Sequence, residues 1–137
     1  MQYKNLLKIA KINGAAGPSQ TVTIPSEFFR TLLITALRAK GAFDEDFYLA
    51  ANPDVRDAIR KQEIASAADH YYTTGYFEGR MPKRFLVDED FYLAENPDVG
   101  RAIKLKRVKN GQVHFDTNGF DEGRAPYEGF SLLGNSE

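Results

Sequence analysis

Cysteine is absent from this chain of 137 residues, which excludes disulfides, thiol catalysis and thiolate metal sites. Long apolar runs are also absent, so we expect no segment that inserts into a membrane. Met1 is followed by polar residues without a hydrophobic segment, from which we expect no secretion signal and a cytoplasmic location. A formal net charge of −1 provides no global field that would attract nucleic acid.

The common catalytic motifs are missing as well. No phosphate-binding loop, dinucleotide-binding glycine pattern, nucleophile elbow or His-Glu-x-x-His pair occurs. The sequence therefore predicts no enzymatic activity, no cofactor and no metal site. Apolar residues still make up 42% of the chain, which is enough for a folded core.

What the chain does contain is an internal duplication with an offset of 44 residues. Residues 44–50 (DEDFYLA) recur at 88–94, and residues 52–55 (NPDV) recur at 96–99. Between 43–82 and 87–126, which align without a gap, 20 of 40 positions are identical. A period of this length indicates tandem structural repeats. A polar residue present in both copies is then expected to hold the shape of the unit.

Each copy reads as two or three short helices. Asp44 and Asp88 are expected to cap the first helix, and Asn-Pro-Asp (Asn52, Pro53, Asp54; Asn96, Pro97, Asp98) to form the corner to the second. The second helix should run from Pro53 to about Gln62, with Asn52 as its cap. Ser66 and Asn110 are expected to cap a third helix, with Gly75 and Gly119 ending it and Gly79 and Gly123 allowing a tight turn.

The N-terminal part is predicted to be a cap region. Residues 3–12 and 21–24, on either side of a Gly-rich loop, are compatible with a short β-hairpin. Ser26 then begins a helix whose apolar stripe runs from Phe28 to Leu37, with Gly41 as its stop. This helix needs a partner surface, either the first repeat or a second copy of the chain.

The predicted fold is therefore mainly α. It comprises a cap region at 1–41, helical repeats at 42–84 and 85–126, and a C-terminal tail at 127–137. Because one unit buries little surface, we expect the two copies to share an interior.

Two sets of shared residues invite a functional interpretation. His70 and His114 could be metal ligands or bases, but a histidine packed on aromatic rings and bonded to a neighbouring carbonyl is the favoured interpretation. Arg80 and Arg124, in the repeated Glu-Gly-Arg, could bind anions or a partner; pairing with a carboxylate or a helix C-terminus within the repeat junction is favoured.

One basic run distinguishes the second copy from the first. Residues 101–109 carry Arg101, Lys104, Lys106, Arg107 and Lys109, whereas the equivalent residues 57–65 include Asp57 and Glu63. A solvated helix face is the favoured interpretation, and contact with phosphate or another polyanion is the alternative.

The duplicated motif, with its His-Tyr or His-Phe and its Gly-x-x-Glu-Gly-Arg-x-Pro, resembles a bacterial tandem repeat. That repeat accompanies glycosyltransferases of surface-polysaccharide synthesis and occurs in some large secreted repeat proteins. The resemblance covers about 43–126 and implies a non-catalytic accessory module. Residues 20–25, followed by Glu27 and Phe28, are in turn similar to the strand-Pro-helix element of swapped-hairpin transition-state regulators, which bind DNA as dimers.

We therefore expect a non-enzymatic scaffold or interaction module, linked to bacterial envelope or exopolysaccharide biology. Its partner would be a protein or a second copy of the chain, with polysaccharide as another candidate. The alternatives are a dimeric DNA-binding regulator that uses the basic run, and a glycan-binding accessory module.

Overall fold

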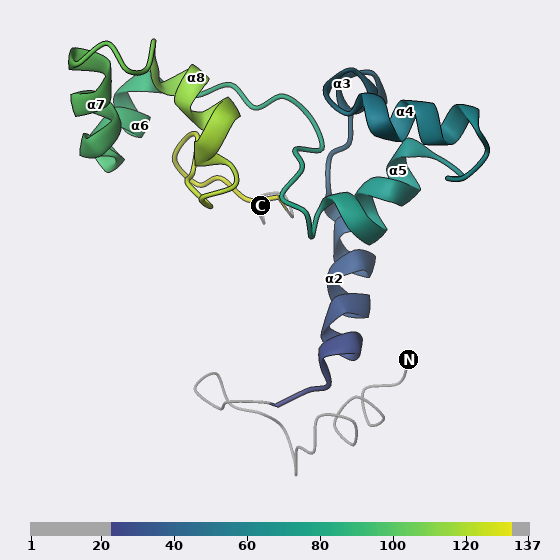
Figure 1. Ribbon diagram of the computed structural model, residues 1–137. Helices are drawn as coiled ribbons and strands as arrows, with labels where there is room; N and C mark the ends of the chain where they lie inside the picture. Colours follow the sequence, from purple (N-terminus) through teal and green to yellow (C-terminus); the bar gives the residue numbers. More distant parts are fainter. Residues whose placement is uncertain (1–22, 133–137) are drawn as a thin grey trace. The chain divides into compact units, whose positions relative to one another are not determined.

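The computed structural model describes residues 23–132, and this part of the chain is mainly α-helical, without a β-strand (Figure 1). The chain divides into two compact units, 1–36 and 37–137. The predicted mainly α fold is thus confirmed. The predicted N-terminal hairpin falls almost entirely on residues 1–22, which lie outside the described residues.

The predicted N-terminal helix is present as α2 (Ser26–Lys40). Its first turn closes with a hydrogen bond from the Phe29 amide to the Pro25 carbonyl (3.0 Å). Gly41 follows the last residue, as expected, and a Cβ there would lie 2.5 Å from the Leu37 carbonyl oxygen. The end of this helix therefore requires glycine for close backbone approach.

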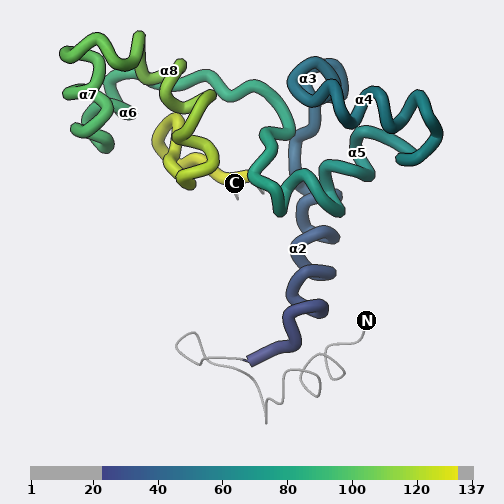
Figure 2. The backbone as a smooth tube through the Cα atoms, viewed as in Figure 1, coloured from purple at the N-terminus to yellow at the C-terminus, as the bar shows by residue number. Residues whose placement is uncertain are grey.

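The first copy forms four consecutive elements, which the tube in Figure 2 traces as tight successive turns. They are α3 (Glu45–Ala51), α4 (Pro53–Arg60), α5 (Ala67–His70) and the π-helical segment η1 (Tyr71–Gly75). Asp44 caps α3 by accepting a hydrogen bond from the Phe47 amide, and Ser66 caps α5 by accepting one from the Asp69 amide. Both caps were predicted from the sequence.

The second copy repeats these elements in the same order: α6 (Glu89–Glu95), α7 (Pro97–Lys104), α8 (Gly111–His114) and η2 (Phe115–Gly119). Asp88 and Asn110 cap α6 and α8 through the Phe91 and Val113 amides. Equal residues at equal spacing thus give equal local structure.

The third helix of each copy differs from the prediction in its second half. We expected an α-helix that ends at Gly75 or Gly119. The helix does end there, but its second half is a wider π-helical turn. The Tyr76 amide donates to the Tyr71 carbonyl, and the Phe120 amide donates to the Phe115 carbonyl. Among the glycines of the two copies, Gly79 (φ 73°) and Gly123 (φ 71°) have positive φ, which fits the predicted tight turn.

Each copy is centred on its own aromatic cluster. In the first, Tyr48, Val55 and Tyr71 are buried, and the Phe43 ring lies 5.3 Å from that of Tyr48. The second has a cluster of four buried residues, Phe85, Tyr92, Val99 and Phe115. The helix-to-helix contacts in the described part of the chain all fall within one copy. The helices of the two copies therefore do not pack together in the shared interior that we expected. Each copy contains enough large aromatic rings to form a core of its own.

The beginning of the C-terminal tail belongs to the second core. Phe130 and Leu132 pack against its buried cluster, and the Phe130 ring lies 5.1 Å from that of Phe85, edge to face.

Candidate functional site

The shared tyrosine and histidine of each copy meet at the point where the first and third helices pack. The Tyr48 hydroxyl lies 2.9 Å from Nδ1 of His70, and the Tyr92 hydroxyl lies 3.0 Å from Nδ1 of His114. Both tyrosines are fully buried. Burial raises the pKa of Tyr48 to about 12 and also raises the pKa of Tyr92, because the phenolate would lose its hydration.

This pairing gives each of the two histidines a hydrogen-bond partner inside its own copy. Each ring packs against the tyrosine of its own copy, with centroids 6.1 Å apart in both. The favoured interpretation expected a carbonyl as the bonded group, and the group is a tyrosine hydroxyl instead. Within residues 23–132, no group of three or more histidine, aspartate or glutamate side chains could hold a metal ion.

The contact between tyrosine and histidine, which we call the Tyr-His joint, also requires glycine at positions 75 and 119. A Cβ on Gly75 would collide with the Tyr48 hydroxyl, and one on Gly119 would collide with the Tyr92 hydroxyl. Neither glycine has a positive φ. The two glycines end the third helix, as predicted, and glycine is needed there to let the buried ring approach the backbone.

The shared arginine of each copy connects the Asn-Pro-Asp corner with the Glu-Gly-Arg turn. Arg80 bonds the carboxylates of Asp54 (2.9 Å) and Glu78 (2.7 Å), and donates to Oδ1 of Asn52 (2.9 Å). In the second copy, Arg124 bonds Asp98 (2.9 Å), Glu122 (2.6 Å) and Asn96 (2.8 Å). We call these two networks the arginine brackets.

The ion pairs of the arginine brackets shift the pKa values of their members. The hydrogen bond from Arg124 holds the pKa of Asp98 down at about 2, and the bond from Arg80 lowers the pKa of Asp54. The bond to Asp98 in turn raises the pKa of Arg124. Arg80 and Arg124 thus have carboxylate partners inside their own copy, which leaves less of their charge for an external anion.

Asn52 and Asn96 occupy the N-cap position of the second helix, as predicted for Asn52, but their side chains make no capping hydrogen bond. The Asn52 amide nitrogen donates to the Tyr48 carbonyl (2.8 Å), and its oxygen accepts from Arg80. The side chain turns back because it can satisfy both the end of the first helix and the bracket. Pro53 and Pro97 occupy the first position of the second helix, as predicted.

The basic run lies at the end of α7 and in the connection to α8. Its five cations, Arg101, Lys104, Lys106, Arg107 and Lys109, are all exposed. Within the described part of the chain, no carboxylate lies within ion-pair distance of any of them. This run therefore differs from the arginine brackets, whose charges are neutralised internally.

Sequence reasoning missed two features near this run. Glu89 accepts hydrogen bonds from the Gly111 and Gln112 amides (both 2.8 Å) and so caps α8 a second time. Lys106 (φ 56°) and its equivalent Gln62 (φ 61°) adopt the left-handed conformation. Glu45 matches Glu89 in the sequence, so the alignment contained no signal for the additional cap. The left-handed conformation of Lys106 and Gln62 could not be predicted from the sequence, because glycine is the usual residue in that conformation and neither of them is glycine.

The chain matches no protein-family model, no curated protein and no solved structure. Among the described residues, no helix combines the length and apolar character needed to cross a membrane.

Proposed function

We propose that this chain is a non-enzymatic interaction module built from two tandem helical repeats. The observation that carries the proposal is the use of the shared polar residues. In both copies, tyrosine bonds histidine, and arginine bonds asparagine, aspartate and glutamate, with equivalent partners and nearly equal distances. Because these shared polar residues bond one another inside each copy, they support a structural role for the motif.

A partner surface is offered by the N-terminal half of α2. Phe29 and Leu32, one helical turn apart, are 52% and 42% exposed. Large apolar side chains in such an arrangement are typical of a helix that docks on another protein. The proposed partner is a protein, in the first instance a second copy of the chain through α2, since helices with an apolar stripe commonly pair.

The resemblance of the repeated motif would place such a module beside bacterial surface-polysaccharide synthesis, where it would act as a scaffold. A glycan is then the second candidate for the partner. Nothing in this role requires a cofactor.

Self-association can be tested with a matched pair of variants on α2. Phe29→Glu combined with Leu32→Glu should convert a dimer into a monomer in light scattering, because the introduced charges would have to be desolvated on pairing. Thr31→Glu combined with Thr35→Glu adds the same charge at exposed positions whose hydroxyls bond only backbone carbonyls of their own helix. We expect this control to stay dimeric. A wild-type chain that is monomeric at all concentrations would contradict the proposed self-association.

A further inference from the structure

The end of α7 carries a charge that its counterpart in the first copy does not. Residues 101–109 contain five cations and no acidic residue, whereas residues 57–65 contain two cations and two carboxylates. In the first copy, Arg60 lies 3.7 Å from Asp57, so part of that charge is paired locally. Both segments have the same helix and the same turn, so the shared architecture does not require the additional charge.

A leucine is exposed in the middle of these cations. Leu105, between Lys104 and Lys106, is 61% exposed. Its backbone is fixed by two hydrogen bonds that close the helix, from the Lys106 amide to the Ile103 carbonyl and from the Arg107 amide to the Ala102 carbonyl (both 2.9 Å). Lys61 occupies this position in the first copy, so the turn itself does not need leucine.

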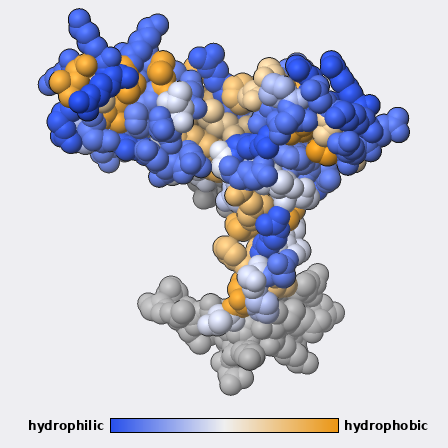
Figure 3. Space-filling model, viewed as in Figure 1, coloured by the Kyte–Doolittle hydropathy of each residue, from blue (hydrophilic) through white to orange (hydrophobic). Residues whose placement is uncertain are grey.

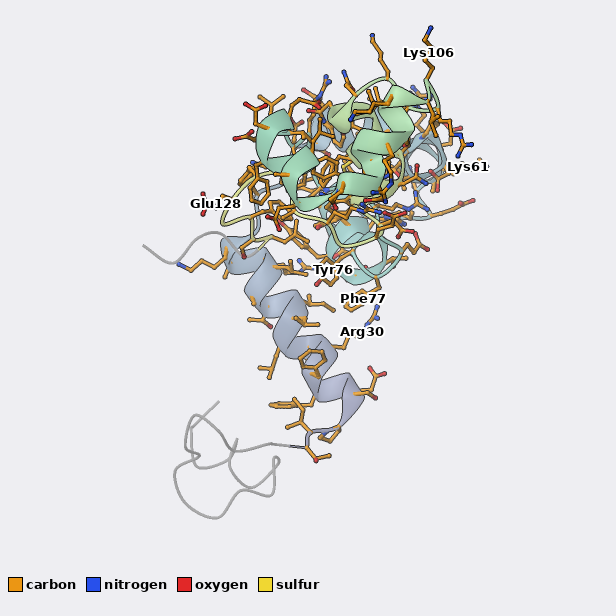
Figure 4. The ribbon with its side chains drawn as sticks, turned by 90° about the vertical axis from the view of Figure 1, so that its left-hand side faces the viewer. Arg30, Lys61, Tyr76, Phe77, Lys106 and Glu128 are labelled. Atoms are coloured by element: carbon orange, nitrogen blue, oxygen red, sulfur yellow. The ribbon has the colours of Figure 1, made fainter. Side chains whose placement is uncertain are left out.

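In the space-filling view, hydrophilic and hydrophobic residues lie side by side over the part of the molecule that carries α7 (Figure 3). The side chain of Lys106 extends outward from its turn, as does that of Lys61 in the first copy (Figure 4). We call the segment 101–109, with its five cations and Leu105, the basic turn.

We propose that the basic turn attaches the chain to the surface of a membrane that contains anionic lipids. Lysine and arginine near such a surface are attracted to the headgroups, and each strengthens attachment roughly fivefold. Leu105 would enter the boundary between headgroups and acyl chains, where an apolar side chain is stabilised.

A lipid surface fits the basic turn better than a nucleic acid does. On a duplex, the exposed leucine would face hydrated phosphates and would stay in contact with water. Bases of a single strand would stack on aromatic side chains, and the basic turn has none. An anionic bilayer satisfies both the cations and the leucine.

The absence of tryptophan from the chain makes a direct test available. The full-length Leu105→Trp variant places a single indole in the basic turn, and Lys61→Trp places one at the equivalent position of the first copy. With phosphatidylcholine vesicles that also contain phosphatidylserine, the indole emission of the Leu105→Trp protein should shift to the blue and that of the Lys61→Trp protein should not. Vesicles of phosphatidylcholine alone should leave both unchanged. No shift in the Leu105→Trp protein, or an equal shift in both variants, would overturn the proposal.

Replacing residues 101–109 by the sequence of 57–65 keeps the helix and the turn but removes the net charge of five. Vesicle sedimentation should then show binding weakened by about a hundredfold or more. Circular dichroism should show unchanged helix content. Wild-type binding should also weaken as salt is raised. If the wild-type chain instead bound duplex or single-stranded DNA and ignored the vesicles, the basic turn would be a nucleic-acid site and the proposal would be wrong.

Discussion

At the scale of single residues, the glycines of the third helix are constrained by the ring that they face. Tyr48 is fully buried and its hydroxyl bonds His70, so it cannot move away from a new side chain without losing that bond. A methyl group on Gly75 would meet this hydroxyl directly. The same geometry exists between Tyr92 and Gly119.

Gly75→Ala should therefore destabilise the protein by about 1–3 kcal/mol, the range for overpacking a buried site. Removing the hydroxyl with Tyr48→Phe should reduce that cost, so a double-mutant cycle measured by chemical denaturation should show coupling between the two positions. Gly100→Ala is the matched control, because no atom lies within 4 Å of its added Cβ. The control should gain about 0.5–1 kcal/mol, since alanine is the better helix former. A Gly75→Ala protein as stable as wild type would rule out this packing.

The structural role of a residue could be predicted from the sequence only where it depends on neighbours along the chain. The caps at Asp44, Asp88, Ser66 and Asn110 follow from short-range hydrogen bonding, and the structure confirms them. The partner of His70 could not be predicted, because Tyr48 lies 22 positions earlier and meets it only in the folded unit. The bracket between Arg80 and Asp54 spans 26 positions and was anticipated only as pairing with an unnamed carboxylate or a helix C-terminus.

At the scale of elements, the ends of α4 and α7 share a strained position. Gln62 and Lys106 each occupy the left-handed conformation that follows a helix, where glycine is the usual residue. A non-glycine residue in this conformation costs about 1–2 kcal/mol.

Lys106→Gly and Gln62→Gly should therefore each stabilise the protein, by about 1 kcal/mol after the greater freedom of glycine in the unfolded chain is taken into account. Arg101→Gly, inside α7, should instead destabilise by about 0.5–1 kcal/mol. Thermal unfolding of the three variants measures the difference. Equal losses in all three would show that these turns are not left-handed.

The order of the helices in each copy could be predicted from the sequence, but the π-helical type of the last segment could not. The positions of Asn-Pro-Asp fixed the boundary between the first two helices of each copy, because proline cannot continue the preceding helix and can begin the next. The π-helical half of the third helix gave no comparable signal. In this half, the hydroxyl of Tyr48 or Tyr92, which comes from another helix, occupies the space next to the glycine.

At the scale of the whole molecule, the duplication has divided the roles of the residues. Those that both copies share, such as Tyr48 and Arg80, form the joint and the bracket of each unit. Those that differ, above all segment 101–109, form surfaces that the fold does not require. The structural roles are duplicated, and the proposed lipid contact belongs to one copy.

The acid-base behaviour of the two brackets follows from this arrangement. The folded pKa of Asp98, about 2, lies below the value near 3.9 expected for an unfolded chain. The unfolded state therefore binds more protons between these values. The stability that the pair contributes is present above about pH 4 and is lost as the pH falls towards 2. The pKa of Asp54 is lowered by the same kind of bond, so the first copy should lose stability in the same direction.

Carboxyl carbon NMR titration of Asp54 and Asp98 tests whether the shared motif residues hold each unit together. Both aspartates should titrate below the ordinary range, with Asp98 near 2. In the Arg124→Met protein, Asp98 should return towards 3.9 while Asp54 keeps its lowered pKa, because each bracket lies within one copy. Ordinary pKa values for both aspartates in the wild-type protein would show that the arginine brackets do not hold the two units together.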